Sequence, residues 1–152
     1  MSRRFQFALE PVLAHRKRIE EERQQEVAVA QRALNEATAQ LLDLHDKYRR
    51  YTKSLHDDHK SFDGEQLRLY YAHLEFLDRA ITEQEAVVSQ RKAEHEATRV
   101  RLLEAAKEKK ALEKLKERRR EAHLAAQALI EQKEMDDNNA RRYARSSPGG
   151  TL

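Results

Sequence analysis

Residues 27–55 read VAVAQRALNEATAQLLDLHDKYRRYTKSL, and their apolar members recur at alternating intervals of three and four residues. The repeating positions are Val27, Ala30, Leu34, Ala37, Leu41, Leu44, Tyr48, Tyr51 and Leu55. This spacing is typical of a coiled-coil seam, in which one narrow stripe of a helix faces a partner. The positions between are mostly polar, so the segment cannot be buried on all sides. The stretch therefore predicts a long helix that needs one partner helix.

A second stripe with the same spacing follows Gly64. Its members are Leu67, Tyr70, Leu74, Leu77, Ile81 and Val88, with Gln84 as the one polar member. If the chain folds back near Ser61, the two stripes match in reverse order, so that Leu55 lies opposite Leu67 and Leu34 opposite Val88. Two stripes with one mirror register predict an antiparallel hairpin.

The fold class that we predict is all-α, a long two-helix antiparallel coiled-coil hairpin with unequal arms. Pro11 is tolerated only in the first turn of a helix, and Asp63 with Gln66 resembles a capping box at the start of the second helix. The expected boundaries are a hairpin over residues 1–145, with a helix at about 10–59, a turn at about 60–64, a helix at about 65–142, and a disordered tail over residues 146–152.

The second arm is longer than the first. In the mirror register Leu13 reaches only about Lys109, so a stretch from about Leu115 to Arg142 has no partner unless residues 1–10 fold along it. A single helix without a partner is marginal in water. This overhang is therefore expected to dock on another molecule.

The composition excludes several classes of protein. Charged residues make up 38% of the chain, 30 basic and 27 acidic, and there is no cysteine to form disulfides or thiolate metal sites. No apolar run approaches the 18 or so residues of a membrane span, and the N-terminus lacks the pattern of a signal peptide. A coiled coil in a reducing cytoplasm is expected.

Catalytic and metal chemistry find little support in the sequence. His56, His59 and Asp63 could together bind zinc, but a hydrated helix end before a turn is the favoured interpretation. The other histidines share no spacing, and a long coiled coil offers no concave pocket for converging groups. We predict no enzyme activity, no metal and no cofactor.

The strongest charge run is residues 107–120, KEKKALEKLKERRR, with eight basic and three acidic residues. A basic helix of this kind could enter a nucleic-acid groove, so a basic coiled-coil nucleic-acid-binding protein is the alternative function. The interleaved acids favour a face that binds protein, and no nucleic acid is expected. A self-associating structural coiled coil is a third possibility.

Three motifs resemble the FliJ family of flagellar export proteins, over residues 5–145. They are Phe5-x-Phe7-x-Leu9-x-x-Val12-Leu13-x-x-Arg16-x-x-x-Glu20, then Lys110-x-Leu112-Glu113-Lys114-Leu115-x-Glu117, and Glu131-x-Lys133-x-Met135-Asp136-Asp137, with Asp137 in place of the usual Glu. The resemblance implies an antiparallel coiled coil like the rotor stalk of rotary ATP synthases. It also implies a monomeric, cytoplasmic protein that associates peripherally with the inner-membrane export apparatus.

The resemblance also implies partners. One copy would sit in the pore of the hexameric export ATPase FliI, contact the export gate FlhA and escort export chaperones. The positions matching the gate-contacting surface are Gln40, Leu44, Tyr51, Leu77 and Ala80. For Leu44, Tyr51 and Leu77, packing inside the seam is the favoured interpretation, and Gln40 is the better candidate for an outward contact. The chain departs from its relatives at Lys47, His73 and Gln84, where Tyr, Phe and His are common.

The overhang and the basic run supply candidates for contact with the ATPase. Placed inside a ring, the overhang would present an apolar ridge flanked by basic side chains. The candidates are Arg118, Arg119, Arg120, Leu124, Leu129 and Ile130.

Overall fold

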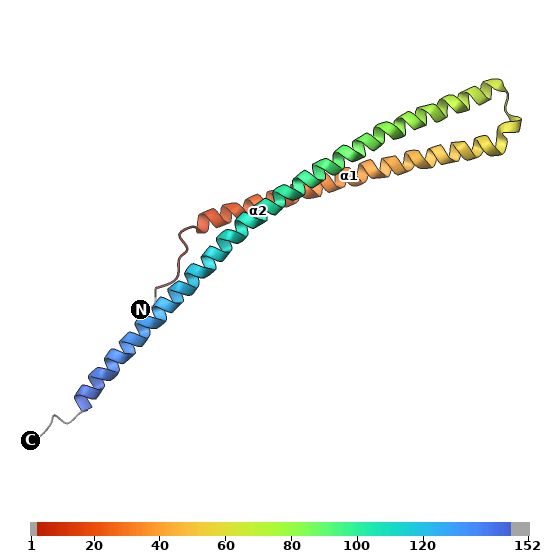
Figure 1. Cartoon of the computed structure of the whole chain (residues 1–152). Coiled ribbons are helices and arrows are strands. Elements are labelled where there is room, and N and C mark those ends of the chain that lie inside the picture. Colours follow the sequence, from red (N-terminus) through yellow and green to blue (C-terminus); the bar gives the residue numbers. More distant parts are fainter. Residues whose placement is uncertain (1–2, 147–152) are drawn as a thin grey trace, which may run out of the picture. The chain divides into compact units, whose positions relative to one another are not determined.

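The computed structural model describes residues 3–146 and consists of two long helices joined by a short turn (Figure 1). Helix α1 spans Glu10–Asp58 and has 49 residues, the 3₁₀ turn η1 spans His59–Ser61, and helix α2 spans Gly64–Ser146 and has 83 residues. The predicted all-α antiparallel hairpin with unequal arms is confirmed. Helix α2 runs past the expected end near Arg142 to Ser146 itself, and the rest of the expected tail lies outside the described residues.

The turn between the helices is formed by local interactions. Phe62 is extended, with φ −96° and ψ 137°, and its ring stacks on Tyr70 with centroids 4.7 Å apart. The Gln66 amide nitrogen donates to Asp63 Oδ1 at 2.8 Å, and the Asp63 amide nitrogen donates to Gln66 Oε1 at 3.1 Å. This reciprocal pair is the predicted capping box, and it satisfies backbone donors that the first turn of a helix leaves free.

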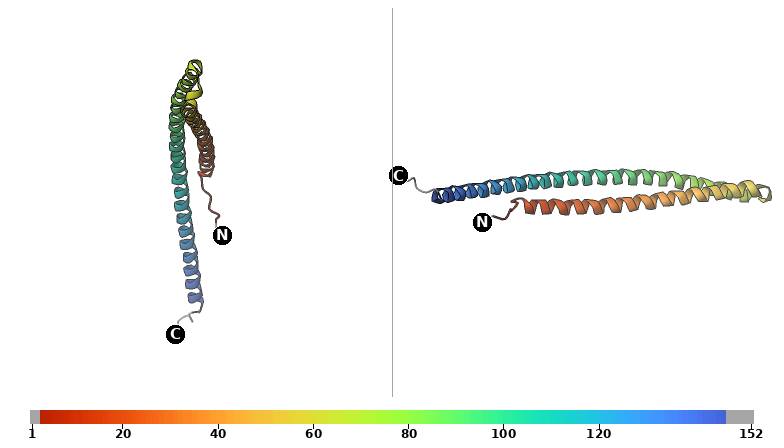
Figure 2. Two further views of the ribbon diagram at one scale, coloured as in Figure 1. Left: turned by 90° about the vertical axis from the view of Figure 1, so that its right-hand side faces the viewer. Right: turned by 90° about the horizontal axis from the view of Figure 1, so that it is seen from below.

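Two compact units make up the described chain, residues 3–17 with 107–146, and residues 18–106. Within residues 18–106, α1 and α2 run side by side (Figure 2). Leu77, Ile81 and Val88 of α2 are buried, and Tyr51 lies beside Tyr70 with ring centroids 5.6 Å apart. The predicted register is therefore present. Most other seam members are half-buried, because two helices alone leave both edges of a seam open to solvent.

The unit of residues 3–17 and 107–146 has a different construction. Leu13 of α1 is 2% exposed, and Glu10 forms an ion pair with Lys116 at 2.8 Å. Before α1 begins, residues 3–9 have no helix or strand and pack against α2, with Phe7 only 7% exposed. The alternative that the sequence analysis left open, in which residues 1–10 fold along the second helix, therefore holds for residues 3–9, which lie on one side of α2 as far as Gln127.

A comparison of two leucines of α2 tests the seam. Leu77 is 2% exposed and Leu69 is 71% exposed. Leu77→Ala should lower the free energy of unfolding by about 2–5 kcal/mol, because it removes buried methyl groups and leaves a cavity. Leu69→Ala should change it by less than about 0.5 kcal/mol. Urea denaturation of both variants, followed by circular dichroism, measures the difference, and equal losses would contradict the assigned seam.

Candidate functional site

The gate-contact candidates differ in accessibility. Leu77 is buried, Leu44 and Ala80 are half-buried, Tyr51 is 37% exposed, and Gln40 is exposed. Leu77 therefore packs inside the hairpin, where its side chain cannot touch a partner unless the helices separate. Gln40 and Tyr51 offer the most accessible surface of the five.

Gln40 belongs to a polar cluster that crosses the two helices. The Gln84 side-chain amide donates to the Ala37 carbonyl at 3.0 Å and to Gln40 Oε1 at 3.2 Å. Gln84, one of the departures from the family pattern, is thus bonded within the hairpin. A shallow groove of about 510 Å³ lies beside this cluster, lined by Glu36, Ala39, Gln40, Asp43, Leu44 and Gln84.

Aromatic rings form a connected series at the turn end of the hairpin. From Phe62 and Tyr70 the ring contacts continue to Tyr51, then to His73 at 4.2 Å and on to Phe76 at 6.1 Å. His73 is therefore the fourth of these five rings, between Tyr51 and Phe76. Lys47, a further departure, pairs with Asp43 on its own helix at 3.1 Å.

Two exposed apolar side chains near this series were missed by the sequence analysis. Phe76 is 61% exposed and Leu69 is 71% exposed. Phe76 stands three residues after His73 and Leu69 four residues before it, so all three side chains lie along one edge of α2. The sequence could have identified this edge, because Leu69 and Phe76 are apolar, lie outside the seam and are separated by seven residues, which is two turns of a helix.

The ATPase-contact candidates are also exposed. Leu124, Leu129 and Ile130 have exposed fractions of 53%, 70% and 58%, and the three arginines are exposed. At about 100° per residue, Leu129 lies about 140° and Ile130 about 120° around the helix from Leu124, in opposite directions. The three apolar side chains therefore point to three sides of α2 and do not form a single ridge.

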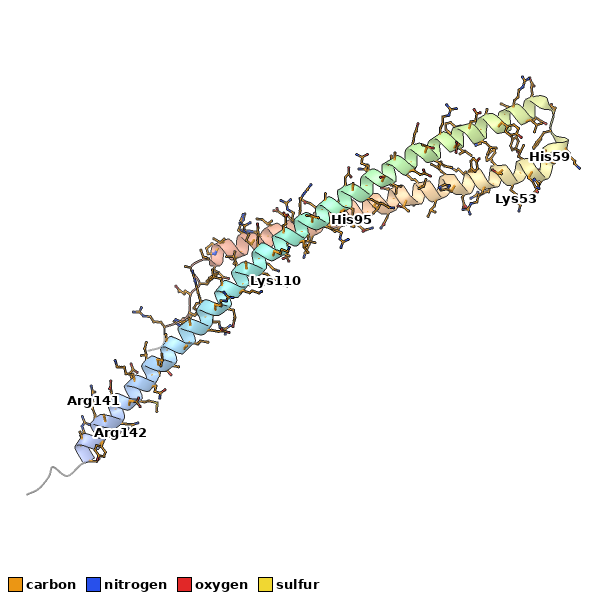
Figure 3. The ribbon with its side chains drawn as sticks, viewed as in Figure 1. Lys53, His59, His95, Lys110, Arg141 and Arg142 are labelled. Atoms are coloured by element: carbon orange, nitrogen blue, oxygen red, sulfur yellow. The ribbon has the colours of Figure 1, made fainter. Side chains whose placement is uncertain are left out.

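Beyond Ile130, α2 has no covering element among the described residues. All side chains of residues 131–146, the terminal segment, are exposed, including Met135 at 63% and Tyr143 at 77%. Arg141 and Arg142 project from its last turns (Figure 3). The terminal segment can therefore be approached from every side.

Residues 3–9, which we name the strap, cover one side of the candidate stretch. The Arg3 carbonyl accepts a hydrogen bond from Gln127 Nε2 at 2.6 Å and lies 2.8 Å from His123 Nε2. The Phe5 ring contacts His123, and the Arg119 guanidinium lies 5.7 Å from the centre of the Phe7 ring. The sequence analysis recorded the alternation of Phe5, Phe7 and Leu9 but not the stripe of α2 on which these residues pack.

A groove continues from the end of the strap along α2. It has a volume of about 470 Å³ and is lined by Arg3, His123, Ala126, Gln127, Ile130, Glu131 and Glu134. Ile130 thus faces the strap side of the helix, as Arg119 does. Two of the six ATPase-contact candidates therefore lie next to the strap.

Neither a metal site nor a membrane span emerges from the described structure. Within residues 3–146 no three histidine or acidic side chains converge in a way that could hold a metal ion, and this includes His56, His59 and Asp63. No helix in the same range is long and apolar enough to cross a bilayer. The accessible features of the described chain are therefore faces and shallow grooves.

Comparisons with known proteins give one family. A family model described as Flagellar FliJ protein matches residues 5–148. No curated protein matches the chain. Among solved structures, a protein described as a YscO homolog from Chlamydia trachomatis is similar over 97% of this chain and 100% of its own, with 20% sequence identity and a TM-score of 0.45.

Replacing the one buried ring of the strap tests how the strap supports α2. Phe7→Ser should release the strap, because Phe7 is its only buried side chain. Backbone amides of residues 112–127 should then exchange faster with deuterium, since local opening of a helix costs less when its packing is lost. Amides of residues 74–88, in the other unit, serve as the internal control. Unchanged exchange at residues 112–127 would contradict the packing described for the strap.

Proposed function

Because the chain belongs to the FliJ family of flagellar proteins, which are non-enzymatic components of the type III export apparatus, we propose that it is a stalk-like coiled coil. It binds the FliI-like export ATPase ring, couples that ring to the FlhA-like export gate and escorts export chaperones. It works in the cytoplasm as a monomer and reaches the inner membrane only through the gate.

The observation that carries this proposal is the exposure of α2 on all sides over its last turns. Apolar residues of a helix that packs on one surface share one face. Here Leu124, Leu129 and Ile130 point to three sides, and residues 131–146 are exposed throughout. A partner that encloses the helix, as a ring does, covers all of these side chains at once.

The turn end of the hairpin supplies the surface proposed for the gate. Tyr51 is accessible there, Leu69 and Phe76 add exposed apolar surface, and Gln40 is accessible farther from the turn. Exposed apolar side chains gathered on one edge are typical of protein interaction sites. Leu44, Leu77 and Ala80 support this edge from within the hairpin.

The basic run favours a protein partner over nucleic acid. Arg119 lies over the Phe7 ring, Lys116 is paired with Glu10, and Glu113 lies 4.0 Å from Lys109. Part of the positive charge is thus already engaged within the chain. A helix that tracks phosphates needs its basic side chains free along one face.

Two truncations test where contact with the ATPase resides. A chain that ends at Leu115 keeps residues 18–106 and should stay helical, but it should fail to stimulate ATP hydrolysis, because it lacks all six candidates. A chain that ends at Gln132 keeps the six candidates and the strap but lacks most of the terminal segment, so it should stimulate hydrolysis to an intermediate level. Steady-state hydrolysis by the export ATPase encoded with this protein is the measurement. Equal stimulation by the shorter truncation and the full chain would place the contact elsewhere.

Neutralising Arg118, Arg119 and Arg120 to Gln tests the basic contribution. Binding to the ATPase should weaken, and the loss should shrink as salt concentration rises, because exposed charges are screened over about 10 Å at 0.1 M salt. The matched control neutralises Arg49, Arg50 and Lys53, which are exposed in the other unit, and should bind as the unchanged chain does. Tight binding of duplex DNA at physiological salt, lost in the Arg118–Arg120 variant, would favour the nucleic-acid alternative.

A further inference from the structure

We propose that the strap is an autoinhibitory cover on the stretch of α2 that contacts the ATPase. A ring can then close around this stretch of α2 on all sides only after residues 3–9 have left the helix. This inference rests on the function proposed above for that stretch, and it adds a means of regulation to it.

The strap lies along one side of the candidate stretch, in contact with Arg119 and next to Ile130. The Arg119 guanidinium lies over the Phe7 ring at 5.7 Å, and Ile130 lines the groove that begins at Arg3. All six candidates have exposed side chains, with Ile130 at 58%. A partner that encloses α2 nevertheless meets the strap on the side of Arg119, His123 and Gln127.

Side-chain packing and the polar contacts of one carbonyl hold the strap on α2. Phe7 is buried, Phe5 and Leu9 are half-buried, and the polar contacts concentrate on the Arg3 carbonyl. Residues 3–7 form neither helix nor strand, so their order is not supported by regular backbone pairing. Fixing each residue of an extended segment costs conformational entropy that these contacts must offset. Leaving the helix therefore breaks side-chain packing and the polar contacts of one carbonyl but no regular backbone pairing, as an exchangeable cover requires.

Helix α2 can survive when the strap leaves. Its backbone hydrogen bonds are internal, and residues 107–146 continue a helix that begins at Gly64. Extending an existing helix avoids the cost of nucleation, although fraying increases. Opening the strap then uncovers His123 and Gln127, on the same side as Arg119.

A cleavable crosslink between the strap and α2 tests the proposed cover directly. The chain contains no cysteine, so the double variant Phe5→Cys with His123→Cys, which joins two side chains in contact, can be linked by a short bis-maleimide that carries a cleavable disulfide. The full-length protein tied in this way should stimulate the export ATPase several-fold less than the same protein after the linker is cleaved.

The matched control crosslinks the start of α1 to α2, just after the strap, and leaves residues 3–9 free. Glu10→Cys with Lys116→Cys replaces an ion pair of 2.8 Å, and linking these positions should leave the stimulation unchanged. Equal stimulation by the tied and released forms of the Phe5–His123 pair would overturn the cover while leaving the proposed function intact. Failure of the unmodified protein to stimulate the ATPase at all would overturn both.

Opening the strap should have the opposite effect. Phe7→Ser should lower the concentration of this protein that gives half-maximal stimulation of the ATPase. If only a fraction of the unchanged protein has an open strap, the largest possible decrease is by a factor of one divided by that fraction. Circular dichroism confirms that the variant remains helical. An unchanged half-maximal concentration in a helical variant would mean that the strap does not oppose binding, and the inference would fail.

Discussion

A seam one stripe wide is the constraint on which the structure depends. Its apolar residues must be covered, yet a single partner helix covers only one side of each helix. Within residues 18–106 this leaves Leu77 and Ile81 buried, while many other seam members remain half-buried. Within these residues the hairpin therefore gains its stability from a line of contacts. The accessible features described for residues 3–146 are edges and shallow grooves, such as the groove beside Gln40.

The apolar stripe of α2 must also be covered beyond the point where α1, the shorter helix, begins. Helix α1 begins at Glu10, with Pro11 in its first turn, so it cannot extend far enough to cover α2 beyond Lys116. An extended chain rises about 3.3 Å per residue, whereas a helix rises about 1.5 Å. Residues 3–9, which form no helix, reach along more of α2 than seven helical residues would, because they contact it as far as Gln127. A non-helical segment thus extends the cover of α2 with few residues.

Features set by local spacing could be predicted from the sequence. The two stripes, their mirror register and the Asp63–Gln66 cap follow from three-four periodicity and capping preferences. The position of the strap on α2 could not be predicted. The alternation of Phe5, Phe7 and Leu9 indicates an extended segment, but it does not show on which side of α2 that segment packs. The expected ridge was wrong for a simpler reason. Leu124, Leu129 and Ile130 are close in sequence, but their separations of five, six and one residues are not those of one helical face.

The polar member of the seam links the fold to the proposed gate surface. Gln84 stands where an apolar residue would otherwise pack, and its amide donates both to the Ala37 carbonyl and to Gln40. A polar group at a seam position favours the one register in which it finds a partner. Gln40 is therefore part of the hydrogen bonding that fixes the hairpin, as well as an accessible side chain. A partner that takes up the Gln40 amide must supply a new acceptor or donor of its own, because the half-buried Gln84 amide loses one of its two acceptors when that contact breaks.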